Sequence, residues 1–157
     1  MLFRTILAGA AAATLAGSAS AQLEIFEDYT LSDAVWEVST IKVDANMEDY
    51  YLEGLKGTWV EANEVAKSLG HIEDYSIFAS AMPQSGHFNL MLAVKFSSMA
   101  DLAPSKAKYD EFITAWGESK LDETRETSQN YPELREITGQ YVMHELTMIG
   151  VGSDEDS

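Results

Sequence analysis

Residues 89–96, with the sequence NLMLAVKF, are the stretch from which the fold of this chain is predicted. In a β-strand, successive side chains point to opposite faces of the sheet. One face of this strand carries four apolar residues: Leu90, Leu92, Val94 and Phe96. The other face carries Met91 and Ala93 at its centre and is too apolar for a solvated surface. The strand therefore needs a cover on both of its faces.

On either side of this strand, the spacing of apolar residues switches between the period of a strand and the period of a helix. Apolar residues alternate with polar ones over 34–44, 72–82 and 137–149, which predicts three further strands. Between the strands, 44–71 and 105–116 repeat apolar residues every three or four positions, the pattern of amphipathic helices. Segment 117–136 is polar, and we expect a helix end followed by a long loop there.

The ends of these helices also carry signals. Asp44 or Asn46 can cap the first helix, and Ser105 can cap the second. Gly54 and Gly57 lie inside the first helix, where each costs about 1 kcal/mol relative to alanine. They indicate either a close approach to another backbone or local tolerance.

The order of elements is β-α-β-β-α-β, which predicts an α+β, ferredoxin-like fold. In that fold the four strands form one antiparallel sheet, and both helices cover the same face. The other face would present a bare apolar set: Trp36, Val38, Phe78, Met91, Tyr141 and Met143. An apolar patch of that extent typically marks an interface, so we expect a second copy of the chain to cover it.

With this element order, the chain resembles the dimeric α/β-barrel superfamily, whose ferredoxin-like subunits pair sheet to sheet. The resemblance covers Val35 to Ile149. The superfamily includes antibiotic-biosynthesis-monooxygenase, EthD-like and NIPSNAP-like domains, as well as haem-degrading members. It implies a homodimer with a ligand cavity either between sheet and helices or inside the barrel. No trio of Asn, Trp and His in this chain matches the pattern of the haem-degrading members, so no functional residue is carried over.

The first 21 residues have the pattern of a secretory signal peptide. Arg4 precedes an apolar run that ends in Ala19-Ser20-Ala21, a small-residue cleavage site. The run is shorter than a membrane-spanning helix, so we expect a periplasmic or secreted protein with no membrane insertion after cleavage. Residues 22–34 are expected to form an N-terminal arm, 35–149 the ferredoxin-like domain, and 150–157 an acidic disordered tail.

Composition excludes several classes of function. The formal net charge of −16 disfavours binding to nucleic acid or to anionic lipid. Without cysteine the chain has no disulfide, thiol nucleophile or thiolate ligand. No spacing of histidines suggests a metal site, and the motifs of serine hydrolases, zinc proteases and nucleotide-binding loops are missing. We therefore predict no catalytic residue and no metal.

The candidate pocket residues lie on the predicted bare face and in the last strand: Trp36, Phe78, Met91, Tyr141, Met143, His144 and Glu145. His144 and Glu145 are adjacent, so their side chains point to opposite faces, and a shift of one residue in strand phase would exchange them. If Glu145 points into the barrel, burial would raise the pKa of its carboxyl; otherwise it is a rim charge.

These observations favour an exported dimer that binds a small apolar or aromatic ligand and needs no cofactor. Two alternatives remain open. One is a cofactor-free enzyme resembling the monooxygenases, with Glu145 or His144 beside the substrate. The other is haem binding through His144 or His71.

Overall fold

The computed structural model describes residues 23–150, which form one antiparallel sheet and a layer of helices. The strands are β1 (Tyr29–Val43), β2 (Asp74–Ala79), β3 (Leu90–Phe96) and β4 (Arg135–Met148). Their order in the sheet is β2-β3-β1-β4, which confirms the predicted ferredoxin-like fold. The predicted signal peptide and residues 151–157 of the predicted tail lie outside the described residues.

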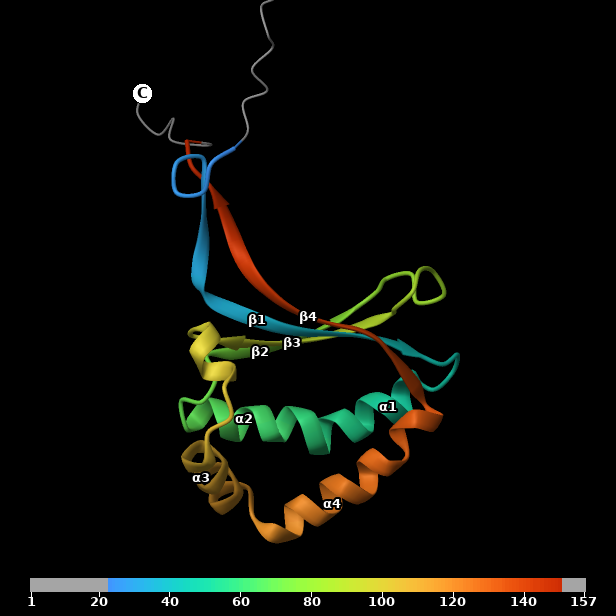
Figure 1. The fold of residues 1–157 in the computed structure, drawn as a ribbon. Coiled ribbons are helices and arrows are strands. Elements are labelled where there is room, and N and C mark those ends of the chain that lie inside the picture. Colours follow the sequence, from blue (N-terminus) through green and yellow to red (C-terminus); the bar gives the residue numbers. More distant parts are fainter. Residues whose placement is uncertain (1–22, 151–157) are drawn as a thin grey trace, which may run out of the picture.

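All the main helices lie on one side of the sheet (Figure 1). The first crossover is a single rod made of α1 (Glu48–Leu55), the π-helical turn η1 (Lys56–Val60) and α2 (Glu61–Ser68). The second contains α3 (Lys106–Trp116) and α4 (Glu118–Gln129). The short 3₁₀ turns η2 (Met99–Leu102) and η3 (Tyr131–Glu133) precede α3 and β4. Within residues 23–150, no helix has both the length and the apolar character that crossing a bilayer requires.

The core lies between the sheet and the first crossover. Its buried members come from β1, β3, α1 and η3: Ile41, Val43, Leu90, Leu92, Tyr51, Leu55 and Tyr131. Asn89 closes the end of this layer, because its side chain accepts a hydrogen bond from Val43 N and donates one to Val43 O, each of 2.8 Å. Because Leu90 and Leu92 belong to this core, they face the helices, as the alternation in NLMLAVKF predicts.

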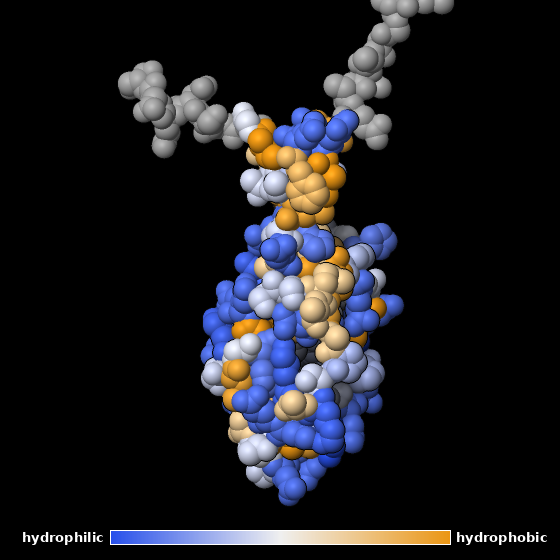
Figure 2. All heavy atoms as spheres, turned by 60° about the vertical axis from the view of Figure 1, so that its left-hand side comes forward, coloured by the Kyte–Doolittle hydropathy of each residue, from blue (hydrophilic) through white to orange (hydrophobic). Residues whose placement is uncertain are grey.

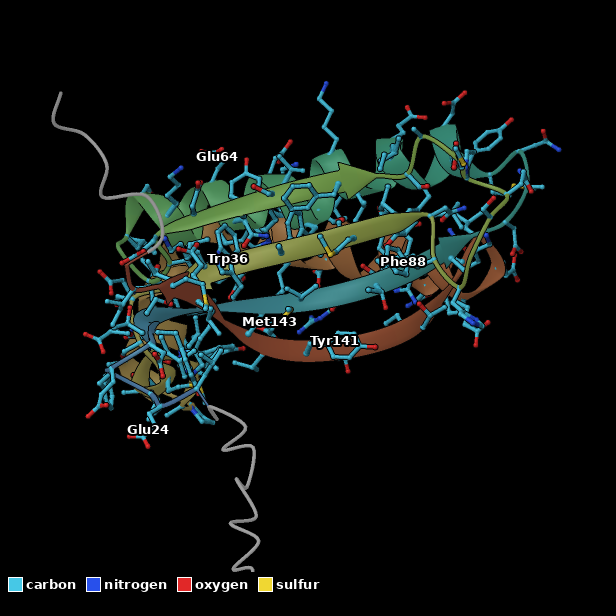
Figure 3. All side chains as sticks on the ribbon, turned by 90° about the horizontal axis from the view of Figure 1, so that it is seen from above. Glu24, Trp36, Glu64, Phe88, Tyr141 and Met143 are labelled. Atoms are coloured by element: carbon cyan, nitrogen blue, oxygen red, sulfur yellow. The ribbon has the colours of Figure 1, made fainter. Side chains whose placement is uncertain are left out.

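The opposite face of the sheet has no helix over it (Figures 1 and 3). The start predicted for the first strand, residue 34, is wrong, because β1 begins at Tyr29 and includes residues from the second half of the predicted 22–34 arm. Tyr29, Thr30 and Leu31 pair with Met148, Thr147 and Leu146 of β4. We call these two paired segments, 29–31 and 146–148, the β1–β4 arm. It rises from the sheet on the side away from the helices (Figure 1).

An irregularity in the pairing joins this arm to the sheet. The register shifts between Leu31 and Val35, where three residues of β1 stand opposite one residue of β4. The hydroxyl of Ser32 accepts a hydrogen bond of 3.0 Å from the backbone N–H of Glu145 and donates one of 2.6 Å to Ala34 O. Pairing with a distant strand, rather than local alternation, makes residues 29–33 extended, which is why the sequence pattern did not show it.

The long loop predicted for 117–136 is also wrong, because α4 occupies residues 118–129. Gly117 adopts a φ of 87°, which ends α3 and lets the chain start a second helix. Helix α4 has almost no apolar stripe. Seven of its twelve residues are good helix formers (Glu, Lys, Leu, Arg and Gln), and ion pairs hold it, such as Lys120 with Glu123 and with Glu61 of α2. Hydrophobic periodicity therefore could not reveal it.

Of the two predicted helix caps, one is confirmed and the other is wrong. Ser105 caps α3 as expected, since its hydroxyl accepts a hydrogen bond from Lys108 N. The cap predicted for the first helix is wrong: the residue before α1 is Met47, with no side-chain cap, and Asn46 instead adopts a φ of 66° in the preceding turn.

Candidate functional site

Six of the predicted pocket residues share the open face of the sheet. The pairs Trp36 with Met143, Val38 with Tyr141 and Phe78 with Met91 stand directly opposite each other in the register. Figure 3 looks onto this face and shows Trp36, Met143, Tyr141 and Phe88 spread along it. A hollow of about 550 Å³ lies over this face, lined by Val38, Thr40, His87, Phe88, Met91, Thr138, Tyr141 and Met143. Since Phe78, Tyr141 and Met143 are each about half exposed, the hollow is open to solvent in the single chain.

Glu145, the sixth of these predicted residues, lies at the arm end of the open face. Its Oε1 accepts a hydrogen bond of 2.8 Å from the indole nitrogen of Trp36 and lies 3.7 Å from Lys95 Nζ. The hydrogen bond and the Lys95 charge lower the pKa of the Glu145 carboxyl. In the single chain its side chain is 56% exposed, so the burial that would raise this pKa is absent. The Glu145 carboxylate is therefore an ion-paired group at the rim of the open face.

Of the three histidines, only His87 lines the hollow on this face, and the two considered for haem binding, His144 and His71, lie elsewhere. His144 stands opposite Val35, on the helix side of β4, and its Nδ1 lies 2.8 Å from the carbonyl oxygen of Ser32. His71 follows the first crossover, and its Nε2 lies 3.0 Å from a carboxylate oxygen of Glu111 on α3. Among residues 23–150, no group of three His, Asp or Glu side chains is placed to hold a metal ion.

A second hollow, which we call the helix-side cavity, opens between the sheet and the helices. It measures about 360 Å³ and is lined by Ser39, Ile41, Tyr51, Leu55, Thr58, Trp59, Ala62, Leu92, Thr124, Ser128, Tyr131, Arg135 and Ile137. Its walls come from β1, β3, β4, the first crossover, α4 and η3. Apolar and aromatic walls with a few inward polar groups are the usual composition of a small-molecule site.

The π-helical turn positions one of these polar groups. Thr58 is buried, and its hydroxyl lies 2.9 Å from Gly54 O and 2.6 Å from the phenolic oxygen of Tyr131. π-helical turns are rare and occur frequently at functional sites. Gly54 makes room for the contact: a Cβ atom at this position would lie 2.9 Å from a ring carbon of Tyr131. The close approach predicted at Gly54 is therefore to a side chain and not to a backbone, while Gly57 has open space around it.

Arg135 supplies the positive charge of the cavity. Its guanidinium lies 5.8 Å from the ring centre of Tyr51 and 5.7 Å from that of Tyr131, within the range of cation–π attraction. The two rings meet edge to face at 5.1 Å. Burial raises the pKa of the Tyr51 phenol, and the neighbouring Arg135 opposes that rise. The raised pKa keeps the Tyr51 phenol neutral at neutral pH.

Two buried polar atoms in the described chain have no hydrogen-bond partner, and both belong to residues that line this cavity. They are Nε of Arg135 and Oγ1 of Thr124. A buried polar atom without a partner costs about 1–3 kcal/mol, and an acceptor that reached either atom would remove that cost.

Sequence reasoning missed this set of residues. Thr124, Tyr131 and Arg135 fall in the segment predicted as a loop, and Thr58 lies in a helix whose aromatic stripe indicates core packing. The only signal in the sequence was the resemblance to the dimeric α/β-barrel superfamily, which implies a ligand between sheet and helices as one of two places.

Comparison with known proteins adds likenesses of fold. No family model matches the chain, and no curated protein matches it. Protein SO0527 from Shewanella oneidensis is 15% identical over 76% of this chain and 98% of that chain, with a TM-score of 0.47. HapK from Hahella chejuensis is 10% identical over 78% and 98%, with a TM-score of 0.43. A dimeric ferredoxin-like protein of unknown function from Thermobifida fusca is 4% identical over 74% and 92%, with a TM-score of 0.37. These likenesses assign no role to any residue of this chain.

Proposed function

We propose that this protein works as a homodimer and binds a small, largely apolar ligand in the helix-side cavity of each subunit. The observation that carries the proposal is the cavity itself. Apolar walls from β1, β3 and the first crossover meet polar groups from η1, α4 and β4 around about 360 Å³ of space. That volume lies within the usual range for sites that take a small organic molecule.

The open face supports the homodimer. Its apolar side chains lie on the sheet side that the helices leave free, and the β1–β4 arm rises on that same side (Figure 1). Near the end of the arm, further apolar side chains are exposed: Leu23, Ile25, Phe26, Leu31, Leu146, Met148 and Ile149. Figure 2 shows apolar residues gathered there, above a largely polar body. A two-fold axis through the open face would bury both surfaces at once.

The geometry favours binding over acid–base catalysis. The lining of the helix-side cavity contains no carboxylate and no imidazole. Those are the commonest groups that donate and accept protons in enzymes. The remaining hydroxyls, such as that of Thr58, are suited to orient a bound molecule.

The seven predicted pocket residues stay a prediction. In the proposed dimer, those on the open face would lie between the two sheets, where they contribute to association. The export predicted from residues 1–21 likewise stays part of the proposal, supported by the pattern around Arg4 and Ala21.

Native mass spectrometry of the gently purified protein tests ligand binding. We expect a dimer that carries an additional small mass. The substitution Ala62→Phe places a ring in the cavity and should remove that mass, whereas Ala107→Phe on the exposed surface of α3 should keep it. Equal occupancy in both variants would contradict binding in the helix-side cavity.

The dimer has its own test. Tyr141 on the open face and Tyr109 on α3 are 53% and 60% exposed, so a single chain tolerates a charge at either position. Tyr141→Glu would bury two carboxylates at the two-fold interface and should yield a folded monomer by sedimentation, with Tyr109→Glu remaining dimeric. A wild-type protein that sediments as a monomer at micromolar concentration would refute the dimer.

A further inference from the structure

The helix-side cavity contains a specific arrangement of charge. Arg135 lines it, and no carboxylate among residues 23–150 forms an ion pair with this guanidinium. The aromatic rings of Tyr51 and Tyr131 contact the cation but do not neutralise it. Arg135 is also the one lysine or arginine among the residues that line this cavity.

Two hydrogen-bond donors without an acceptor also favour a negatively charged group in this cavity. Arg135 Nε carries a hydrogen that no described group accepts, and the hydroxyl of Thr124 is likewise unpaired. The two residues come from different elements, β4 and α4, and both line this cavity. Both can donate a hydrogen bond, and a carboxylate oxygen is the acceptor that an arginine fork fits best.

We propose that the ligand is a small aromatic or aliphatic monoanion, whose acidic group binds Arg135 and Thr124 and whose apolar body lies against Leu55, Trp59 and Leu92. This inference rests on the proposed function, because it specifies the chemical class of the ligand in the same cavity. The long-range field of the acidic chain repels anions, so recognition depends on these local donors.

A pair of fluorescent probes separates charge from shape. 1-Anilinonaphthalene-8-sulfonate and N-phenyl-1-naphthylamine share the same rings, but only the first carries an anionic group. We expect wild-type protein to bind the sulfonate more tightly. Arg135→Gln should weaken the sulfonate by about ten- to a hundredfold and leave the neutral probe unchanged, because a hydrogen bond to a charged group is lost only in the first case.

Two further variants complete the titration. Thr124→Val keeps the shape of the side chain, removes its donor and should weaken only the sulfonate, which supplies the test even where Arg135→Gln fails to fold. Arg125→Gln is the matched control, since Arg125 lies on the exposed surface of α4 and pairs with Asp122. Arg125→Gln should leave the affinity for both probes unchanged.

The outcomes distinguish the two proposals. If Ala62→Phe abolishes binding of both probes but Arg135→Gln and Thr124→Val affect them equally or not at all, the cavity is a site without preference for anions and this inference is wrong. If Ala62→Phe leaves both probes bound as in wild type, the cavity is not the site, and the proposed function falls together with the inference.

Discussion

Two glycines of the first crossover should respond in opposite directions to the same substitution. An alanine is about 1 kcal/mol more favourable than glycine inside a helix. At Gly57 a Cβ atom would meet nothing within 4 Å, so Gly57→Ala should stabilise the protein by about 0.5–1 kcal/mol. At Gly54 the new methyl group would lie 2.9 Å from a ring carbon of Tyr131 and 3.2 Å from its hydroxyl oxygen.

Tyr131 has little room to move away. It is 8% exposed, its ring contacts Tyr51 edge to face, and its hydroxyl is hydrogen bonded to Thr58. Overpacking a core typically costs about 1–3 kcal/mol. This exceeds or cancels the helical gain, so Gly54→Ala should destabilise the protein by up to about 2 kcal/mol.

The assay is urea unfolding followed by circular dichroism, at one fixed protein concentration because association changes the apparent stability. A double-mutant cycle supplies the control: in a Tyr131→Ala background the clash disappears, and Gly54→Ala should become as favourable as Gly57→Ala. Stabilisation by Gly54→Ala in the wild-type background would refute the close packing between Gly54 and Tyr131.

Three further predictions follow from buried and charged groups. Asn89→Ala leaves both backbone groups of Val43 without their side-chain partner, so the free energy of unfolding in urea should fall by about 2–4 kcal/mol, and a loss below about 1 kcal/mol would contradict the role of Asn89. A hydrogen bond from Lys108 holds the pKa of Asp101 well below its usual range, so its stabilisation is present above about pH 4 and is lost as pH falls. The urea midpoint of Asp101→Asn should therefore fall less than that of wild type on acidification, and parallel curves would rule this out. A hydrogen bond to the Glu64 carboxylate of α2 raises the pKa of Tyr75 to about 12, so the stabilisation from this contact is complete below about pH 10 and is lost as pH rises through 12. In an alkaline absorbance titration, Tyr75→Phe should remove the phenol that ionises last, and loss of one that ionises near pH 10 would be inconsistent with the Glu64 contact.

The sequence alone determined the order of elements and the two-sided character of the sheet. Alternation in residues 89–96 and the helical stripe containing Tyr51 and Leu55 depend on neighbours in the chain, so they are visible without coordinates. The ferredoxin-like fold followed from that order. The set of side chains on the open face followed as well, because alternation places Trp36, Met91 and Tyr141 on one side once the strands are paired.

The sequence failed where a structural state depends on distant partners. Residues 29–33 are extended because β4 pairs with them across the chain, and α4 is a helix without an apolar stripe. For Glu145 the sequence left a buried position and a rim position open, and distant partners decide the direction of its pKa shift, because the indole of Trp36 and Lys95 of β3 stabilise its charged form.

The candidate site itself was decided only by the tertiary structure. Thr58 and Tyr131 are 73 positions apart, yet their hydroxyl oxygens lie 2.6 Å from each other. Arg135 and Thr124 belong to a polar segment in which nothing local distinguishes them from solvated residues. They become buried donors because α4 and the start of β4 close over the first crossover, and burial in a shared cavity, rather than residue type, is what makes a donor without a partner costly.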